Sequence, residues 1–393
     1  MTVKHQHLSA ELIKHLYYNK MLTLAELSLL TNKSLPVVTN VINELVIDGY
    51  VLESGLAPST GGRRALMFLL NPKKQKYIVS VAVDQLVTQM VIYDIVKTEI
   101  CPPKIITLNL LKDEDVLTKL VRFIKKNIHD SGIPANQFLG VGIGMPGFIN
   151  PRKGINYSFF NINLTGNLKD YLNEVLDLPV FIDNDSSIIA LAELKFGIGR
   201  GCKDTLVVNF GWGVGLGMVI NGALFKGHSG YAGEFSHIPL LETNTLCSCG
   251  KVGCLEVGTS LLVLVEQALV EISNGTTTRM SKDLINKGKS PGDHLLKAAR
   301  EGDSLAASIL SEAAFLIGKG LSTLIQIINP ELIVISGRGA MAGEMLMPPI
   351  QKAIDLFCIP RLAEQTRISI SNMGDRSQLV GAAILVIENC QFI

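Results

Sequence analysis

The sequence predicts an α/β protein in which a small, mainly helical head precedes a larger body. The 393 residues are enough for two or three domains at roughly 100 to 200 residues each. Residues 9–70 contain three short helical patterns followed by two strand-like segments. From residue 77 onwards, short apolar strands alternate with helices, which is typical of α/β folds. We expect one domain at residues 1–72 and a second at residues 73–393.

The composition excludes a disordered chain and gives no sign of a membrane protein. Hydrophobic residues make up 47% of the chain, charged residues 18%, and mean hydropathy is +0.32. The apolar stretches are shorter than the ~18 residues that span a bilayer. The N-terminus carries no apolar targeting segment, so we expect a cytoplasmic protein with no membrane association. Net charge is +1, although residues 1–76 hold nine Lys and Arg against five Asp and Glu, which makes the head mildly basic.

Three helices are expected in the head, and each has a start signal. Ser9 is expected to cap a first helix that ends near Asn19. Thr23 followed by Glu26 predicts a capping box at the second helix, and Ser34 is expected to cap the third. The apolar residues that recur at helical spacing are Leu12, Ile13, Leu16, Tyr17, Leu24, Leu27, Leu30, Val38, Val41, Ile42 and Leu45.

A strand, a basic tip and a second strand follow the third helix. Gly49 is expected to end that helix at its C′ position. Residues 50–53 and 65–70 are strand-like and flank residues 57–64, which include Gly61-Gly62 and two arginines. This order of elements is typical of a winged helix-turn-helix, in which the second helix braces the third and the strands form the wing.

The third helix and the wing tip carry side chains suited to operator DNA. The start of the third helix bears mostly short side chains, so it could enter the ~12 Å major groove. Arginines on a glycine-loosened tip could reach phosphates or the minor groove. The predicted DNA contacts are Ser34, Pro36, Val37, Asn40, Arg63 and Arg64. The alternative is a three-helix protein-interaction module with two incidental arginines.

The body is predicted to consist of mixed sheets with helices on their faces. Strands are expected at residues 77–83, 88–93, 138–142, 180–182, 206–209, 215–220 and 332–336. The first two of these form a hairpin. Helices are expected at residues 115–128, 187–196, 261–272, 293–299, 305–327 and 345–357.

An amide and a carboxylate follow the apolar strand that begins at Val180. Asn184 and Asp185 stand where open α/β sheets bind ligands, at the carboxyl end of a strand and directly before a helix. An aspartate there can orient and deprotonate a hydroxyl, and an asparagine can both donate and accept, which suits a polyol. The equally weighted alternative is that Asp185 only caps the following helix.

Two glycine-containing turns carry weaker signals. Residues 209–217 alternate glycine with other residues between two strands, which permits close backbone approach to an anion or a sugar. The alternative is a simple hairpin. Residues 329–339 form a strand that ends in a glycine turn, which could hold the adenosine side of a nucleotide or only connect the strand to a helix.

The sharpest signal is a cluster of cysteines near a histidine. Three thiolates and one imidazole complete a tetrahedral Zn²⁺ site of the Cys₃His type. Disulfide bonds do not explain such closely spaced cysteines, because cytosolic cysteines are kept reduced. The expected ligands are His237, Cys247, Cys249 and Cys254, with His228 as a rival to His237. The alternative is three reduced core cysteines. Glu234 and Glu256 flank the site and could accept hydrogen bonds from a neutral polar ligand, or could be surface carboxylates.

Taken in order, these motifs resemble the ROK family (repressor, open reading frame, kinase). The resemblance is to the branch in which a winged helix-turn-helix precedes a sugar-kinase-like body, as in N-acetylglucosamine and xylose repressors. It implies an actin-like, ribonuclease-H-like two-lobed fold, a structural zinc and a sugar in the cleft between lobes. The implied sugar contacts are Asn184, Asp185, Glu234, His237 and Glu256, with His237 serving both metal and sugar through its two ring nitrogens. Asp185 matches the catalytic base of the kinases.

Departures from the family's kinases favour a regulator. The first hairpin of ROK kinases carries an Asp-x-Gly-Gly-Thr phosphate loop, whereas residues 82–87 here contain no glycine and begin with Ala82. Trp212 stands where the family has a small residue, and Ser236 replaces a glycine. We therefore expect a kinase-inactive, sugar-responsive transcriptional repressor that acts as a homodimer or homotetramer. The alternatives are an active sugar kinase with a DNA-binding head, and a zinc-stabilised scaffold that binds no sugar.

Overall fold

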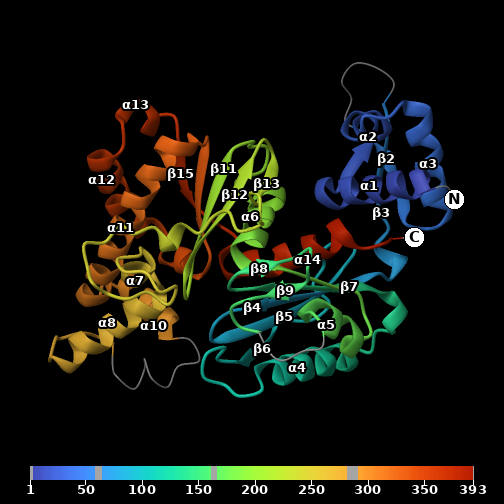
Figure 1. The fold of residues 1–393 in the computed structure, drawn as a ribbon. Helices are drawn as coiled ribbons and strands as arrows, with labels where there is room; N and C mark the ends of the chain where they lie inside the picture. The colour runs from blue at the N-terminus through green and yellow to red at the C-terminus, as the bar shows by residue number, and fades with distance from the viewer. Residues whose placement is uncertain (1–2, 58–63, 161–165, 281–290, 393) are drawn as a thin grey trace.

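The computed structural model describes residues 3–57, 64–160, 166–280 and 291–392. A small N-terminal head adjoins a body of two lobes, and the C-terminal helix passes along the body and ends beside the head (Figure 1). The predicted α/β class, with a winged head in front of a two-lobed body, is confirmed.

The head combines three helices with a three-stranded antiparallel sheet. Its helices are α1 (Val3–Asn19), α2 (Leu24–Thr31) and α3 (Leu35–Ile47). Its strands are β1 (Met21–Thr23), β2 (Val51–Leu56) and β3 (Leu66–Leu70), in the order β1-β3-β2. Leu12, Leu27 and Ile42 are fully buried where the three helices meet, so the expected apolar faces form the core of the head.

Local signals at the ends of the head helices are partly confirmed. The capping box exists: the Glu26 N–H donates to Thr23 Oγ1 (3.3 Å) and the Thr23 N–H donates to Glu26 Oε2 (2.7 Å). Gly49 has a φ of 72°, the left-handed conformation expected after a helix. The prediction for Ser9 is wrong, because α1 begins at Val3 and the Ser9 hydroxyl donates to a carbonyl one turn earlier. Ser34 stands at the N-cap of α3 without a side-chain cap bond.

The first lobe is built on a five-stranded sheet in the order β10-β7-β4-β5-β6. Its strands are β4 (Tyr77–Val83), β5 (Val87–Asp94), β6 (Lys104–Thr107), β7 (Phe138–Met145) and β10 (Val180–Asn184). The hairpin β4–β5 is antiparallel as expected, and β7 pairs parallel with both β4 and β10. Helices α4 (Val116–Asp130) and α5 (Leu168–Leu176) cover one face, and a small hairpin of β8 (Ile149–Asn150) and β9 (Ile155–Asn156) follows β7.

The second lobe is built on another five-stranded sheet, in the order β13-β12-β11-β14-β15. Its strands are β11 (Thr205–Phe210), β12 (Val214–Ile220), β13 (Ala223–Phe225), β14 (Leu332–Ser336) and β15 (Arg367–Ile370). Its helices are α7 (Glu256–Thr259), α8 (Leu261–Ser273), α10 (Pro291–Arg300), α11 (Ser304–Ile328), α12 (Met347–Phe357) and α13 (Pro360–Ala363). Three-residue and longer 3₁₀ segments include η3 (Phe235–His237), η4 (Arg338–Leu346) and η5 (Gly374–Arg376).

Helix α11 is long and apolar enough to cross a membrane by length and composition alone. The expectation that no segment reaches that length is therefore wrong for this helix. The most apolar window of α11 is 61% buried inside the protein, and Ala313, Ile317 and Leu321 pack in the core of the second lobe. The helix is explained as the central core helix of this lobe.

Two helices connect the lobes, α6 (Asp185–Phe196) and α14 (Ser377–Asn389). They pack so closely that a Cβ on Gly381 of α14 would lie 2.2 Å from the Ile188 carbonyl oxygen of α6. On its other side, α6 packs against β12, where a Cβ on Gly217 would lie 2.4 Å from the Ala190 Cβ. Glycine at both positions lets the three elements approach, so α6 and α14 form one close-packed layer between the two sheets (Figure 1).

The far ends of these two helices hold the head. At the end of α6, the Phe196 ring makes an edge contact with Tyr17 of α1 (5.9 Å between centroids) and lies 5.8 Å from the Tyr18 ring. At the end of α14, Glu388 accepts a hydrogen bond from the Tyr18 hydroxyl (2.5 Å), and its carbonyl accepts one from Lys14 Nζ (2.7 Å). The head is therefore anchored by α1 on the C-terminal turns of α6 and α14.

Candidate functional site

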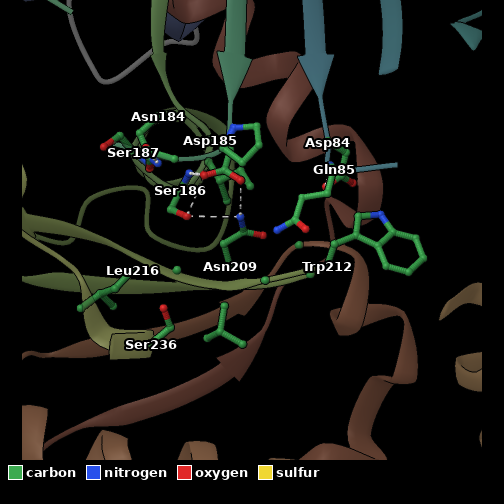
Figure 2. Close-up of a pocket in the computed structure, with 18 of the residues that line it drawn as sticks. Asp84, Gln85, Asn184, Asp185, Ser186, Ser187, Asn209, Trp212, Leu216 and Ser236 are labelled. Atoms are coloured by element: carbon green, nitrogen blue, oxygen red, sulfur yellow. Dashed lines mark hydrogen bonds between the residues drawn. The ribbon is translucent and has the colours of Figure 1, made fainter. Parts of the chain in front are cut away.

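A cavity of about 470 Å³ lies between the two lobes, within the range of small-molecule sites. All five predicted sugar contacts line it: Asn184, Asp185, Glu234, His237 and Glu256. Figure 2 shows that its walls come from the β4–β5 turn, the start of α6 and the β11–β12 turn. The fold thus gathers the five predicted contacts, up to 72 positions apart in the sequence, around one space.

Asn184 and Asp185 meet the cavity at the carboxyl end of β10 and the first turn of α6. Asn184 Oδ1 accepts the Ser187 N–H (3.2 Å), so Asn184 caps the helix. Asp185 Oδ1 accepts the Ser186 N–H (2.7 Å), and Asp185 Oδ2 accepts Asn209 Nδ2 (3.3 Å). Burial raises the pKa of Asp185 to about 6. The cap is made by Asn184, which leaves the Asp185 carboxylate facing the cavity (Figure 2).

Glu256 and Glu234 face the same space from the second lobe. Glu256 is the first residue of α7 and its Oε2 accepts the Val214 N–H from the glycine-rich turn (2.9 Å). Burial raises the pKa of Glu256 to about 7, and burial also raises the pKa of Glu234. Both residues line the cavity, where Glu256 is half-buried and Glu234 is exposed.

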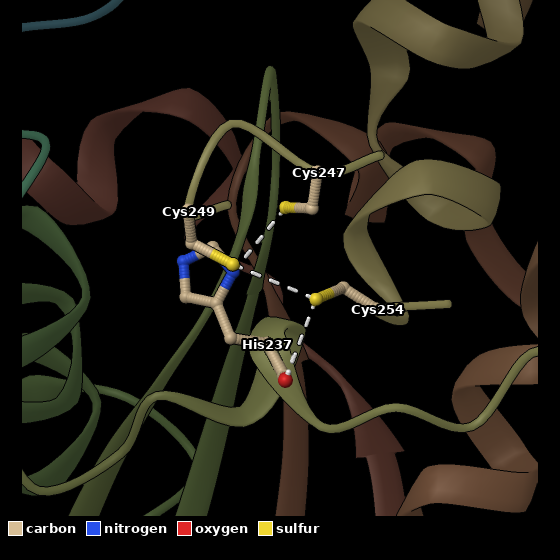
Figure 3. Close-up of side chains that lie close together, drawn as sticks. All are labelled: His237, Cys247, Cys249 and Cys254. Atoms are coloured by element: carbon tan, nitrogen blue, oxygen red, sulfur yellow. Dashed lines mark hydrogen bonds between the residues drawn. The ribbon is translucent and has the colours of Figure 1, made fainter. Parts of the chain in front are cut away.

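The predicted metal ligands form one cluster beside the cavity (Figure 3). One ligand atom from each of His237, Cys247, Cys249 and Cys254 lies within 4.8 Å of the others. Cys247 Sγ is 3.6 Å from His237 Nδ1, and Cys249 Sγ is 3.6 Å from Cys254 Sγ. A tetrahedron with Zn–S bonds of about 2.3 Å places its sulfurs about 3.8 Å apart, so these residues fit zinc. In the part of the chain that the structure describes, His228 is not in this group.

His237 connects the metal cluster with the cavity. Its Nδ1 faces Cys247, whereas its Nε2 lies 3.8 Å from Glu234 Oε2. The Phe148 ring lies nearly parallel to the imidazole at 6.4 Å between centroids. This orientation leaves one ring nitrogen for a metal and turns the other toward the cavity, as the family resemblance implies.

The part of the cavity near the β4–β5 turn is lined by charged and polar side chains. Asp84 and Gln85 stand in that turn, and Arg338 Nε lies 3.9 Å from Asp84 Oδ2 across the lobes. Arg338 also donates two hydrogen bonds of 2.8 Å to Asp293 and lies 5.7 Å from the centre of the fully buried Trp212 ring. Burial raises the pKa of Asp84 to about 7, against the opposing charge of Arg338. This packed, acidic arrangement does not resemble a phosphate cradle.

The lining residues that the sequence-based prediction of the site did not include are numerous; three that matter for the argument are Asn209, Gln85 and Arg338. A signal existed for Asn209 and Arg338, since both belong to the two glycine-containing turns that the sequence singled out. The turn at residues 209–217 connects the antiparallel strands β11 and β12, as the hairpin alternative predicts, and it also lines the cavity. The turn at residues 329–339 connects β14 to η4. The sequence indicates Gln85 only as a residue that replaces a glycine of the kinase turn, and it does not predict that the side chain lines the cavity.

On the head, the predicted DNA contacts of α3 share one exposed face. Ser34, Pro36, Val37 and Asn40 are all exposed, while the intervening Val38 is fully buried. In the wing, the exposed Arg64 donates to the Ala57 carbonyl (2.7 Å) and the Leu56 carbonyl (3.0 Å), which fixes the base of the tip. Arg63 lies outside the described residues.

Fold and cavity together define a class of protein: a sugar-kinase-like, actin-like body fused to a winged DNA-binding head. The chain belongs to the ROK family, whose family model matches residues 111–389, and the resemblance is confirmed. It is 27% identical to the xylose repressor of Caldicellulosiruptor bescii over 96% of this chain and 94% of that protein. It is 33% identical to the glucokinase of Halalkalibacterium halodurans over 69% of this chain and 83% of that protein.

A solved structure supports the whole-chain fold. The crystal structure of a ROK family transcriptional regulator, a homologue of the E. coli MLC protein, covers 98% of this chain and 96% of its own chain with a TM-score of 0.78 at 22% identity. The xylose repressor matches the head as well as the body, whereas the glucokinase match spans only about two thirds of the chain. The full-length relatives are therefore transcriptional regulators.

Proposed function

We propose that this protein is a sugar-responsive transcriptional repressor that acts in the cytoplasm and does not phosphorylate its sugar. The observation that carries the proposal is the combination, on one chain, of a winged head and a sugar-type cavity whose phosphate turn has no glycine. Asn184, Asp185, Glu234, His237 and Glu256 would bind the sugar hydroxyls, and α3 with the wing would bind operator DNA.

The effector in this proposal is an unphosphorylated sugar. The carboxylates that line the cavity are Asp84, Asp185, Glu234, Glu256 and Asp375. The guanidinium of Arg338 is already bonded to Asp293. A phosphate dianion would meet like charge in a partly buried site, which is costly, whereas a neutral polyol can donate its hydroxyls to the carboxylates.

A physical route from sugar to operator supports the regulatory role. The first turns of α6 and α14 line the cavity with Asp185, Ser377 and Gln378, and their last turns hold α1 of the head. Because the two helices form one close-packed layer, a sugar that shifts their N-terminal ends also biases the placement of the head.

Operator binding is expected to need two heads. One winged head offers only the few base-reading side chains of α3, too few for useful specificity among genomic sites. A homodimer or homotetramer would place two heads on a pseudo-palindromic operator. We expect footprinting to show paired half-sites whose protection disappears when a stabilising sugar is added.

Replacing both Arg63 and Arg64 by alanine should reduce the slope of log affinity against log salt by about 0.9 per lost phosphate contact.

The proposal is tested by a thermal-shift screen of sugars and sugar phosphates, followed by that footprint. A protein that no sugar stabilises, or a footprint unmoved by every stabilising sugar, would refute a sugar-responsive regulator. A single unpaired half-site would refute the paired arrangement even if operator binding itself were retained.

A sugar kinase is the second candidate, because the glucokinase relative is 33% identical. We expect no ATP-dependent phosphorylation near the roughly 1–100 s⁻¹ typical of kinases, because Asp84 and Gln85 replace phosphate-cradling glycines and Ala82 replaces an aspartate. A coupled assay with each stabilising sugar measures this. Turnover at such rates that is lost in Asp185→Asn would establish the kinase instead.

A further inference from the structure

Gln85 is a cavity residue whose side chain makes no hydrogen bond to the described part of the protein. Figure 2 shows its carboxamide pointing into the cavity between Asn209 and Trp212. Among the residues that the structure describes, no hydrogen bond to the Gln85 side chain exists, although its main chain is well bonded. The amide is half-buried and open to the cavity, so its donor and acceptor are available to a ligand there.

The main chain around Gln85 fixes where the amide points. The Asp84 N–H donates to the Val87 carbonyl (2.9 Å) and closes the β4–β5 turn. The Leu110 N–H donates to the Gln85 carbonyl (2.9 Å), and the Leu108 N–H donates to the Leu86 carbonyl (3.0 Å). The turn is thus held from both sides, and the side chain projects from a rigid support.

The amide faces the same spot as a predicted sugar contact. A Cβ built on Gly213 would lie 3.4 Å from Gln85 Nε2 and 3.0 Å from Glu256 Oε1. Gln85 comes from the first lobe and Glu256 from the second, so the two groups approach this spot from opposite walls of the cavity. The absent side chain of Gly213 keeps the space between them open.

We propose that Gln85 binds the sugar effector through a hydrogen bond from its amide. This inference rests on the proposed function and adds a recognition residue to it. The cavity carboxylates accept hydrogen bonds wherever they are ionised, and the Asn184 and Asn209 amides already donate within the protein. Gln85 Nε2 supplies a donor for a sugar oxygen in a cavity rich in acceptors. The turn that cradles phosphate in the family's kinases is thereby used for sugar recognition.

The test is isothermal titration of a sugar found in the thermal-shift screen. The proteins are wild type, Gln85→Ala, Gln85→Glu and, as a matched control, Gln365→Ala, which removes an exposed glutamine of the second lobe. We expect Gln85→Ala to weaken binding at least about fivefold, because one sugar oxygen loses its donor. Gln85→Glu should weaken it as much or more, since an ionised carboxylate cannot donate. Gln365→Ala should bind like wild type.

Monodeoxy analogues of that sugar identify the hydroxyl involved. One analogue should bind wild type more weakly, yet show no further loss with Gln85→Ala, because both changes remove the same hydrogen bond. Unfolding temperatures without sugar identify any variant that is merely misfolded, and Gln85→Glu preserves the side-chain length.

Three outcomes decide the question. Wild-type affinity in both Gln85 variants would overturn the inference while leaving the proposed function intact. If the loss of binding free energy in Gln85→Ala adds to the loss caused by every deoxy analogue, the inference is overturned as well, because the effect of Gln85 is then indirect. A wild type that binds no sugar would refute the proposed function itself, and this inference with it.

Discussion

Removing zinc is expected to lower the melting temperature and abolish sugar binding together. Apparent binding free energies of structural zinc are about 10–16 kcal/mol in zinc-finger peptides. Part of that energy would hold the loop from His237 to Cys254, in which Leu246 and Val252 are exposed and contribute little core. We expect a loss of at least ~3 kcal/mol of stability, or roughly 6–12 °C at 2–4 °C per kcal/mol. Sugar binding would be lost because the loop carries one predicted sugar contact and directly precedes another, Glu256.

The measurement is metal analysis of the purified protein with melting curves before and after chelation. About one zinc per chain is expected in the wild type. Cys249→Ser should lose zinc and stability, whereas Cys101→Ser, which removes a partly exposed cysteine outside the cluster, should keep both. A Cys249→Ser protein with full zinc content and unchanged melting temperature would show that these residues hold no structural metal.

Signals within a few residues of each other were predicted most accurately. The Thr23 and Glu26 capping box and the left-handed Gly49 follow from local backbone chemistry that one stretch of sequence contains. The prediction for Ser9 failed for a tertiary reason. Helix α1 begins about two turns earlier, where His5 Nε2 lies 2.6 Å from Glu44 Oε2 of α3, a contact between residues 39 positions apart.

The contact between Asp84 and Arg338 could not be predicted from the sequence. Asp84 and Arg338 meet across the cavity although 254 positions separate them, and neither stands in a repeating pattern. The residue types of the Asp-Gln turn argued against a phosphate cradle, yet they did not show that Gln85 points into the cavity. Such an orientation depends on how the two sheets pack on α6 and α14, which local propensities do not encode.

The docking of the head on the body likewise appears only in the folded chain. Tyr18 and Glu388 are 370 positions apart, and each is unremarkable in its own helix. In the structure they share a short hydrogen bond, and burial together with the neighbouring Glu388 charge raises the pKa of Tyr18 above its ordinary value. The hydroxyl therefore stays protonated and donates to the carboxylate over the physiological pH range.

Breaking this contact is expected to separate sugar binding from operator release. Glu388→Ala removes the carboxylate that accepts from Tyr18 and contacts Lys14, so α14 loses its side-chain hydrogen bonds to α1 and keeps only the one from Lys14 Nζ to the carbonyl of residue 388. The cavity residues and the DNA face of α3 remain in place. We expect sugar affinity and sugar-free operator affinity to change less than about threefold. Typical allosteric couplings change affinity by about 5- to 150-fold. We expect the coupling free energy between sugar and operator to fall to less than half of its wild-type value in this variant.

Fluorescence anisotropy of an operator fragment, titrated with protein in the presence and absence of a stabilising sugar, measures this coupling directly. Tyr18→Phe should reduce it in the same direction, because it removes the donor of the same hydrogen bond and keeps the ring that packs on Phe196. Glu364→Ala removes an exposed carboxylate of the second lobe and should leave the coupling unchanged. Full coupling in both Glu388→Ala and Tyr18→Phe would show that the signal reaches the head by another route. Linkage is reciprocal, so the same coupling can be measured as the effect of operator DNA on sugar affinity. If the signal takes another route, operator DNA should weaken sugar binding equally in wild type and in both variants.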